Sequence, residues 1–171
     1  TARLRRHRPR YRALAIYVLT RSGIVTTQLL AALEGELKAQ APDTWGDDAA
    51  AVLLGASLKL LKADREADQR IDTRFKALGR QGPPLAFLFD GYYDPLVRDA
   101  LTLYLIAKHF PERVAKLPPA AIEQLVDPLS RGLNNTLSSG LSVLALEAYA
   151  ERVAASGAIT LERVDAQGVA T

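Results

Sequence analysis

The sequence has 171 residues, of which 49% are hydrophobic and 24% are charged, the balance of an ordinary globular protein that can bury a full core. It contains no cysteine, which excludes disulfides, thiolate metal sites and cysteine nucleophiles within these residues. No stretch reaches the roughly 18–20 uninterrupted apolar residues that span a bilayer, and no signal-peptide pattern follows the basic N-terminus.

The net charge of +3 is unevenly distributed along the chain. Six arginines lie within residues 1–12, and the first acidic residue is Glu34. A basic arm of this kind can bind phosphates. The simpler interpretation is that these arginines are solvated or pair with acidic surface of a larger parent protein. We assign residues 1–11 to a basic N-terminal arm.

Helical signals recur from residue 9 to about residue 155. The predicted helices carry apolar side chains at helical spacing, and most have a Pro, Thr, Ser or Asp near their start and a Gly or Pro beyond their end. They cover residues 9–20, 26–38, 44–62, 64–78, 94–109, 120–131 and 136–155. Pro9 is placed in the first turn of the first helix, and Thr136 or Ser138 is expected to cap the last.

Two segments do not follow the helical pattern. The Gly-Pro-Pro run at residues 82–84 cannot continue a helix, and the apolar run at residues 85–89 is either a short strand or a buried connection. Residues 157–171 are expected to form a short extended tail or the start of a β-rich neighbouring domain. The sequence therefore predicts an all-α fold of paired helical hairpins. No standard repeat consensus fits, so the array is irregular and is either an open solenoid or a closed toroid.

The histidines do not indicate a metal site. The sequence has two, His7 and His109, and neither has the spacing of a ligand pair. His109 is predicted at the C-terminal end of a helix, where the helix dipole favours a partly cationic imidazole. We expect no metal and no cofactor.

The acidic and hydroxyl residues give no clear catalytic signal. Asp90, Asp94 and Asp99 surround two tyrosines, but a hydrolase needs two acids held on opposing elements, and the simpler interpretation is that Asp94 caps a helix and Asp99 lies beside Arg98. The run at residues 138–140 lacks the GxSxG pattern of a nucleophile elbow. We predict no catalytic residue.

Four sequence segments, taken together and in this order, resemble a known protein family. They are RALAIYVLTRSGIVTTQLLAALEGEL (12–37), PDTWGDDAAAVLLGASLKLLKADREAD (42–68), YYDPLVRDALTLYLIAKHFPERV (92–114) and NNTLSSGLSVLALEAYA (134–150). Together they resemble the bacterial α2-macroglobulins, in the helical thioester-type domain. The resemblance covers about residues 12–155.

The resemblance implies a fold and a role that periodicity alone does not. Residues 12–156 would form the later part of an α/α toroid of paired helices. The parent would be a secreted or periplasmic, often membrane-anchored, broad-spectrum protease trap that acts after a bait region is cut. This chain would be a non-enzymatic interaction domain. Its partners would be other domains of the parent and target proteases, with no nucleic acid. A partial toroid would also have open edges that expose apolar helix faces.

The chain departs from the thioester-bearing members of that family. Their thioester joins the Cys and the Gln of a Cys-x-Glu-Gln motif, whereas Glu123-Gln124 is the only Glu-Gln pair here and Ala121 stands where the cysteine would be. Either the motif lies earlier in the domain, or the parent belongs to the subgroup without a thioester. The four segments favour the subgroup without a thioester. No thioester residue is assigned.

Candidate protein-contact residues lie at the predicted hairpin ends. They are Tyr92, Tyr93, Asn134 and Asn135, because loops at such ends are usual binding positions. The alternative is that they cap helices and fill loop pockets. Two other functions remain open: an α/α-toroid enzyme that uses acids near Asp90 to Asp99, and a TPR-like adaptor that binds peptides in a concave groove.

Overall fold

The computed structural model describes residues 2–80 and 95–156, and every regular element within these two ranges is helical. The elements are α1 (Ala2–Arg21), α2 (Thr27–Gln40), the 3₁₀ helix η1 (Trp45–Asp47), α3 (Ala49–Leu60), α4 (Asp64–Ala77), α5 (Pro95–His109), α6 (Pro111–Val114), α7 (Pro119–Ser130) and α8 (Thr136–Ser156). The predicted all-α class is confirmed. The apolar run at 85–89 and the predicted tail at 157–171 lie outside the described residues.

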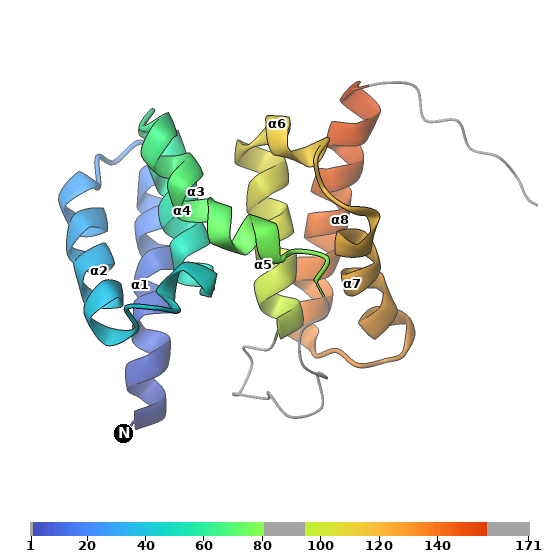
Figure 1. Cartoon of the computed structure of the whole chain (residues 1–171), viewed down its shortest axis with the longest axis horizontal. Coiled ribbons are helices and arrows are strands. Elements are labelled where there is room, and N and C mark those ends of the chain that lie inside the picture. The colour runs from blue at the N-terminus through green and yellow to red at the C-terminus, as the bar shows by residue number, and fades with distance from the viewer. Residues whose placement is uncertain (1, 81–94, 157–171) are drawn as a thin grey trace, which may run out of the picture.

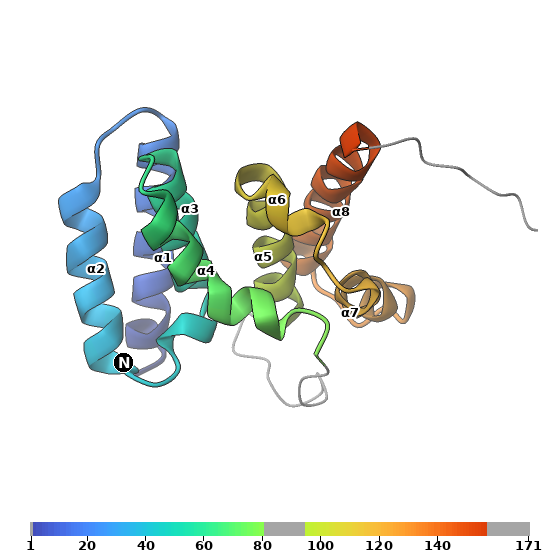
Figure 2. The same cartoon turned by 45° about the horizontal axis from the view of Figure 1, so that its top comes forward.

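The helices form an array with two distinct ends (Figures 1 and 2). Helices α1, α3, α5 and α8 pack in that order, each against the next. Helix α2 packs beside α1 at one end, and α7 lies with α8 at the other. Helix α4 packs on α3 in the middle.

Helix α3 is the most buried element. All its residues from Ala49 to Ser57 are buried, because α1, α4 and α5 surround a helix made largely of alanine and leucine. Gly55 sits where α4 crosses it. A Cβ added at Gly55 would lie 2.5 Å from Ile71 Cγ2 and 3.2 Å from the Ala67 carbonyl oxygen. Only glycine allows the two helices to approach this closely.

The start of α1 differs from the prediction. The helix begins at Ala2, and Pro9 lies inside it rather than in its first turn. Alanine, leucine and arginine, which dominate the residues before Pro9, are strong helix formers. Proline at this position removes one backbone hydrogen bond without ending the helix. Arg8 and Arg10, which the sequence placed in a basic arm, therefore lie on a helix.

The start of the third predicted helix is also different from the expectation. Residues 45–47 form the separate η1 turn, and α3 begins after Asp48, whose Oδ1 accepts a hydrogen bond of 2.9 Å from the Ala50 amide. Arg10 binds the same carboxylate, with Nη2 to Oδ2 at 2.6 Å. Asp48 thus caps α3 and joins it to α1. This pair, and that of Arg12 with Glu36, support the interpretation that the arginines pair with acids.

Other boundaries follow the predictions closely. Helix α4 ends just before Gly79, which has a φ of +75°, and α5 begins at Pro95. The short helix α6 is absent from the sequence prediction. The cap of α8 is Asn135, rather than Thr136 or Ser138, since the Ser138 amide donates to Asn135 Oδ1 at 2.9 Å. Ser138 Oγ accepts from the Asn135 amide at 2.8 Å, which makes the cap reciprocal.

Candidate functional site

The most deeply buried ion pair joins α4 to α5. Arg74 and Asp99 are each 2% exposed, and Arg74 Nη2 donates to Asp99 Oδ1 at 2.9 Å. The other end of the guanidinium reaches η1, where Nη1 donates to Asp47 Oδ1 at 2.5 Å. Arg98 Nε also donates to Asp99 Oδ1, at 3.0 Å. The buried pair of Arg74 and Asp99 is therefore completed by two partly exposed charges, those of Asp47 and Arg98.

Gln124 extends this network to α7. Its Nε2 donates to Asp99 Oδ2 at 2.7 Å, and its Oε1 accepts a hydrogen bond of 2.9 Å from the Gly79 amide. Gly79 itself lies against the start of α7, where an added Cβ would meet Pro118 Cγ at 2.9 Å and the Ala121 amide nitrogen at 3.0 Å. The network fixes α7 against the end of α4.

These contacts decide the role of two residues that the sequence singled out, Asp99 and Gln124. Both oxygens of Asp99 accept hydrogen bonds from buried or half-buried donors, so Asp99 acts as a structural hub. Asp90 and Asp94 lie outside the described residues, and the convergence of three acids stays a hypothesis. Gln124 is engaged in packing, and Ala121 is buried. Gln124 of the Glu-Gln pair thus has a structural explanation in this chain.

His109 has a different state from the one predicted. Burial, together with the positive charges of Arg21 and Arg152, lowers the pKa of His109 to about 4. The imidazole is therefore neutral near pH 7, and the expected partly cationic form is wrong because desolvation and neighbouring cations outweigh the helix dipole. Its Nε2 hydrogen-bonds to the hydroxyl of Tyr17, 2.8 Å away, which links α5 to α1. Burial also raises the pKa of Tyr17.

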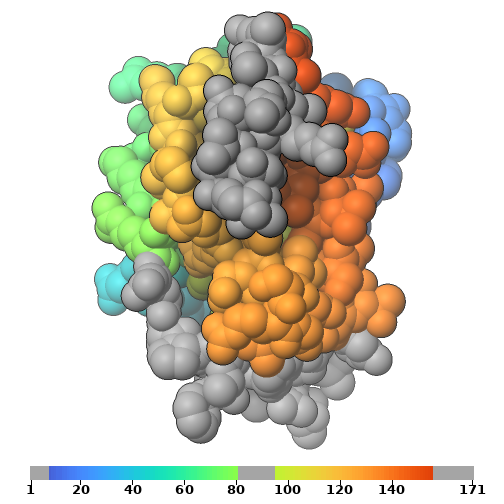
Figure 3. All heavy atoms as spheres, turned by 90° about the vertical axis from the view of Figure 1, so that its right-hand side faces the viewer, coloured from blue at the N-terminus to red at the C-terminus, as the bar shows by residue number. Residues whose placement is uncertain are grey.

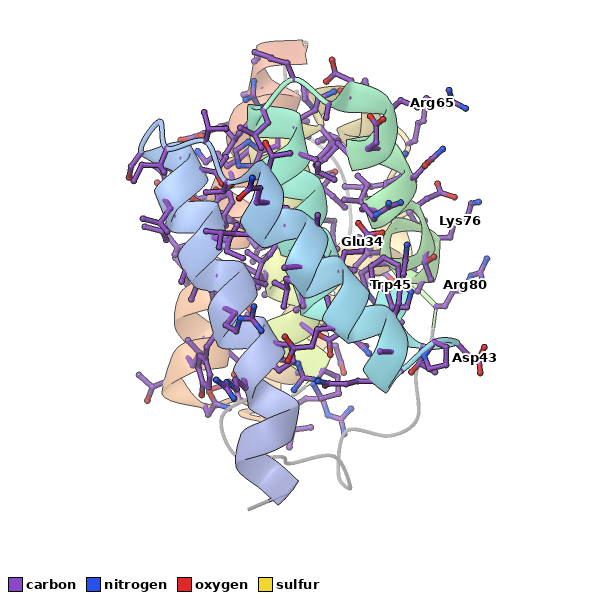
Figure 4. All side chains as sticks on the ribbon, turned by 90° about the vertical axis from the view of Figure 1, so that its left-hand side faces the viewer. Glu34, Asp43, Trp45, Arg65, Lys76 and Arg80 are labelled. Carbon is purple, nitrogen blue, oxygen red and sulfur yellow. The ribbon has the colours of Figure 1, made fainter. Side chains whose placement is uncertain are left out.

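A second polar cluster surrounds Trp45 between α2 and α4 (Figure 4). Lys38 Nζ lies 5.5 Å from the Trp45 ring centre and Arg70 Cζ lies 5.9 Å from it. Both cations also bind Glu34, at 2.6 Å and 2.7 Å. Burial alone would raise the pKa of Glu34, but the hydrogen bonds from Lys38 and Arg70 bring it below its usual value. By contrast, Arg65 points outward from α4 (Figure 4).

The predicted contact residues are only partly placed by the structure. Tyr92 and Tyr93 lie outside the described residues. Asn134 is exposed, and its Oδ1 accepts from Ser139 Oγ at 2.9 Å. Asn135 is half-buried and caps α8. The two asparagines lie together at the start of α8, and a contact with a partner stays a prediction.

Sequence reasoning missed Arg74 and the structural role of Gln124. Arg74 lies in a run of alternating charges that indicates a solvated helix, and Gln124 in a pair noticed only for its likeness to a thioester motif. A weak signal existed at Asp99, which is a lone acid within the apolar run of α5. A buried acid of this kind requires a partner.

Proteins similar to this chain are known from three bacteria. An alpha-2-macroglobulin homolog of Yersinia pestis is 44% identical over 146 residues, which cover 85% of this chain and 7% of that protein. The alpha-2-macroglobulin of Pasteurella multocida (strain Pm70) is 35% identical over 144 residues, or 84% of this chain and 8% of that protein. That of Rickettsia conorii is 33% identical over 144 residues, or 84% and 7%. The chain belongs to the bacterial α2-macroglobulin family.

The match has a limited extent within the family. The chain spans less than a tenth of the length of the α2-macroglobulins that it matches. No family model matches the sequence, and no solved structure matches it. Among the helices described here, none combines the length and the apolar character needed to cross a membrane.

Proposed function

We propose that this chain is part of the helical thioester-type domain of a bacterial protease inhibitor. In this proposal it is a non-catalytic interaction domain of a protease trap. The supporting observation is the similarity to three α2-macroglobulins. It extends over 144–146 residues, or 84–85% of this chain. The same similarity supports a periplasmic or extracellular location for the parent protein.

The mechanism would be conformational. Helix surfaces of this domain would pack against neighbouring domains until cleavage of a bait segment releases them. The buried network of Arg74, Asp99 and Gln124 suits such a role, since it fixes α4, α5 and α7 to one another so that the array moves as a unit. Residues 12–156 would form this domain, as part of an α/α toroid. Tyr92, Tyr93, Asn134 and Asn135 remain the proposed contact positions.

A protease assay on the complete protein encoded by the gene tests the proposal. A trap that encloses a protease should block the hydrolysis of a large protein substrate while a small chromogenic peptide is still cleaved. We expect that selectivity to appear only after the protease has cut the inhibitor, as followed by gel electrophoresis. Unchanged hydrolysis of the large substrate at excess inhibitor would contradict the proposed function.

A matched control separates the domain from the whole inhibitor. The 171-residue chain alone should leave both substrates unaffected, because it holds only a small part of the length of its relatives. If this chain alone blocked the protease, it would be a direct inhibitor and the proposal of a trap would be wrong.

A further inference from the structure

Exposed apolar side chains gather at the two ends of the helical array. Among the described residues, the exposed large hydrophobic side chains lie either from α1 to the first turn of α2 or from α7 to α8. The first group is Tyr11, Leu14, Val18, Leu19, Ile24, Val25 and Leu29, and the second is Val126, Leu133, Leu137, Val143 and Leu144. The helices between the two ends contribute none within the described ranges. Such gathered apolar surface marks an interaction site more often than scattered residues do.

On α1 these side chains share one face of the helix. Tyr11, Leu14 and Val18 follow one another at spacings of three and four residues, and we call them, with Leu19, the α1 stripe. Val18 is 52% exposed and Tyr11 is 68% exposed. The opposite face of the same helix is buried through Ala13, Ile16 and Tyr17. Helix α1 is thus apolar on two sides, of which the array covers one.

Helix α8 has the same character. Leu137, Val143 and Leu144 share an arc with Gly140, and we call these four residues the α8 stripe. Val143 is 62% exposed, and apart from the adjoining backbone of α8 no atom lies within 4 Å of the position that a Cβ of Gly140 would take. Seen from this end, α7 and α8 form much of the surface (Figure 3). The buried side of α8 carries Ala145 and Ala148.

Each stripe is flanked by charge that no described residue of opposite sign pairs with: Arg8 and Arg21 beside the α1 stripe, and Glu147 beside the α8 stripe. Arg8 lies one turn before Tyr11 in the α1 stripe, and Glu147 lies one turn after Leu144 in the α8 stripe. Neither side chain is buried, and neither forms an ion pair with any residue that the structure describes. Their charges define partners of opposite sign: an apolar helix with an acid for the α1 stripe, and one with a base for the α8 stripe.

We propose that both stripes are packing surfaces for further amphipathic helices of the same polypeptide, outside these 171 residues. Stacked helical arrays need polar outer faces where they end, whereas the described residues at both ends of this array expose the apolar stripes. The relatives also extend far beyond the matched region, so they have ample chain to supply such helices. This inference rests on the part of the proposed function that makes the chain a segment of a longer protein.

Cysteine labelling can test the proposal directly, because the chain has no cysteine of its own. The variants Val18→Cys and Val143→Cys each place one thiol in a stripe. Gln69→Cys places a thiol on α4, outside both stripes, as the matched control. Each variant is made in the isolated chain and in the complete protein encoded by the gene. Maleimide labelling rates are read from the mass of the labelled peptide, and circular dichroism checks that each variant folds.

In the isolated chain at low concentration, all three thiols should react at similar rates. In the complete protein, the thiols at positions 18 and 143 should react about tenfold or more slowly, because labelling would require local opening of a packed surface, while position 69 stays unchanged. Equal rates in both proteins would overturn the proposal. So would protection in the isolated chain, which would mean that this chain or a second copy of it covers the stripes. Labelling involves no protease, so its failure is distinct from a failure of the inhibition assay.

Discussion

Replacement of Gly55 by alanine tests how tightly α3 and α4 are packed. In a free helix the change would stabilise by about 1 kcal/mol, because glycine is a poor helix former. In this fold the new methyl would lie 2.5 Å from Ile71 Cγ2, well below the roughly 3.5–4.0 Å at which carbon atoms attract. Ile71 is β-branched and fully buried, so its side chain has no alternative position. Overpacking costs about 1–3 kcal/mol.

The packing cost should exceed the gain in helix propensity. We expect Gly55→Ala to lower the free energy of unfolding by up to about 2 kcal/mol, and Tm by up to roughly 8 °C. Urea denaturation followed by far-ultraviolet circular dichroism measures the first quantity. Gly35→Ala in α2 and Gly140→Ala in α8 are matched controls, since apart from the adjoining helix backbone no atom lies within 4 Å of either Cβ position. Each control should stabilise by about 0.5–1 kcal/mol.

A double variant identifies the clash as the cause. Ile71→Ala alone should cost about 2–5 kcal/mol, and its cost should be smaller in the Gly55→Ala background, where the new methyl fills part of the cavity. The expected coupling is about 0.5–3 kcal/mol. If Gly55→Ala stabilises as much as the two controls do, α3 and α4 have room for a methyl group at position 55, and the proposed close packing of the two helices is refuted.

Three further predictions concern the polar contacts. Asp99→Ala should lower the free energy of unfolding by about 3–5 kcal/mol in urea denaturation, because buried Arg74 would keep only the partly exposed Asp47 as its counter-charge. A loss below about 1 kcal/mol would contradict the buried pair. His109 has a pKa of about 4 when folded and about 6.5 when unfolded, so the unfolded chain takes up the proton first. The free energy of unfolding should therefore fall by about 1–2 kcal/mol, a value discounted for partial solvent exposure, as the pH is lowered from 6.5 to 4. His109→Gln should flatten that fall in denaturation curves taken across the range, and an unchanged slope would contradict the assignment. Asn135→Ala should cost about 1 kcal/mol through loss of the α8 cap, whereas Asn134→Ala should stay within about 0.5 kcal/mol; equal effects in thermal unfolding would contradict the cap.

Local signals in the sequence were enough to place most of the helices. Helix α4 stops before Gly79 and α5 starts at Pro95, because a left-handed glycine and a proline act on the backbone where they stand. Pro9 shows the limit of such signals. Proline is compatible with both the first turn and the interior of a helix, and the choice depends on whether the preceding residues can form helix.

The buried network could not be predicted in the same way. Arg74 and Asp99 are 25 residues apart, and so are Asp99 and Gln124. Charges three and four residues apart on α4 satisfy the pattern of a solvated helix, so nothing local distinguishes buried Arg74 from the more exposed Lys76. The distinction arises only when η1, α5 and α7 pack around the guanidinium. His109 was mispredicted for the same reason, since the helix dipole is local whereas burial against α1 is not.

At the two stripes the sequence indicates burial that the described structure does not provide. Sequence rules give an amphipathic surface helix one apolar face, and a helix that is apolar all round is buried all round. From Ala13 to Leu19, α1 places apolar residues on every side, yet the described array buries Ala13 and Ile16 and leaves Leu14 and Val18 in solvent. Helix α8 repeats the pattern, with Ala145 buried and Leu144 exposed beside it. The composition of both helices thus specifies more burial than the described residues supply. An extended polypeptide like those of the relatives would provide the missing cover, and the labelling rates at positions 18 and 143 measure whether it does.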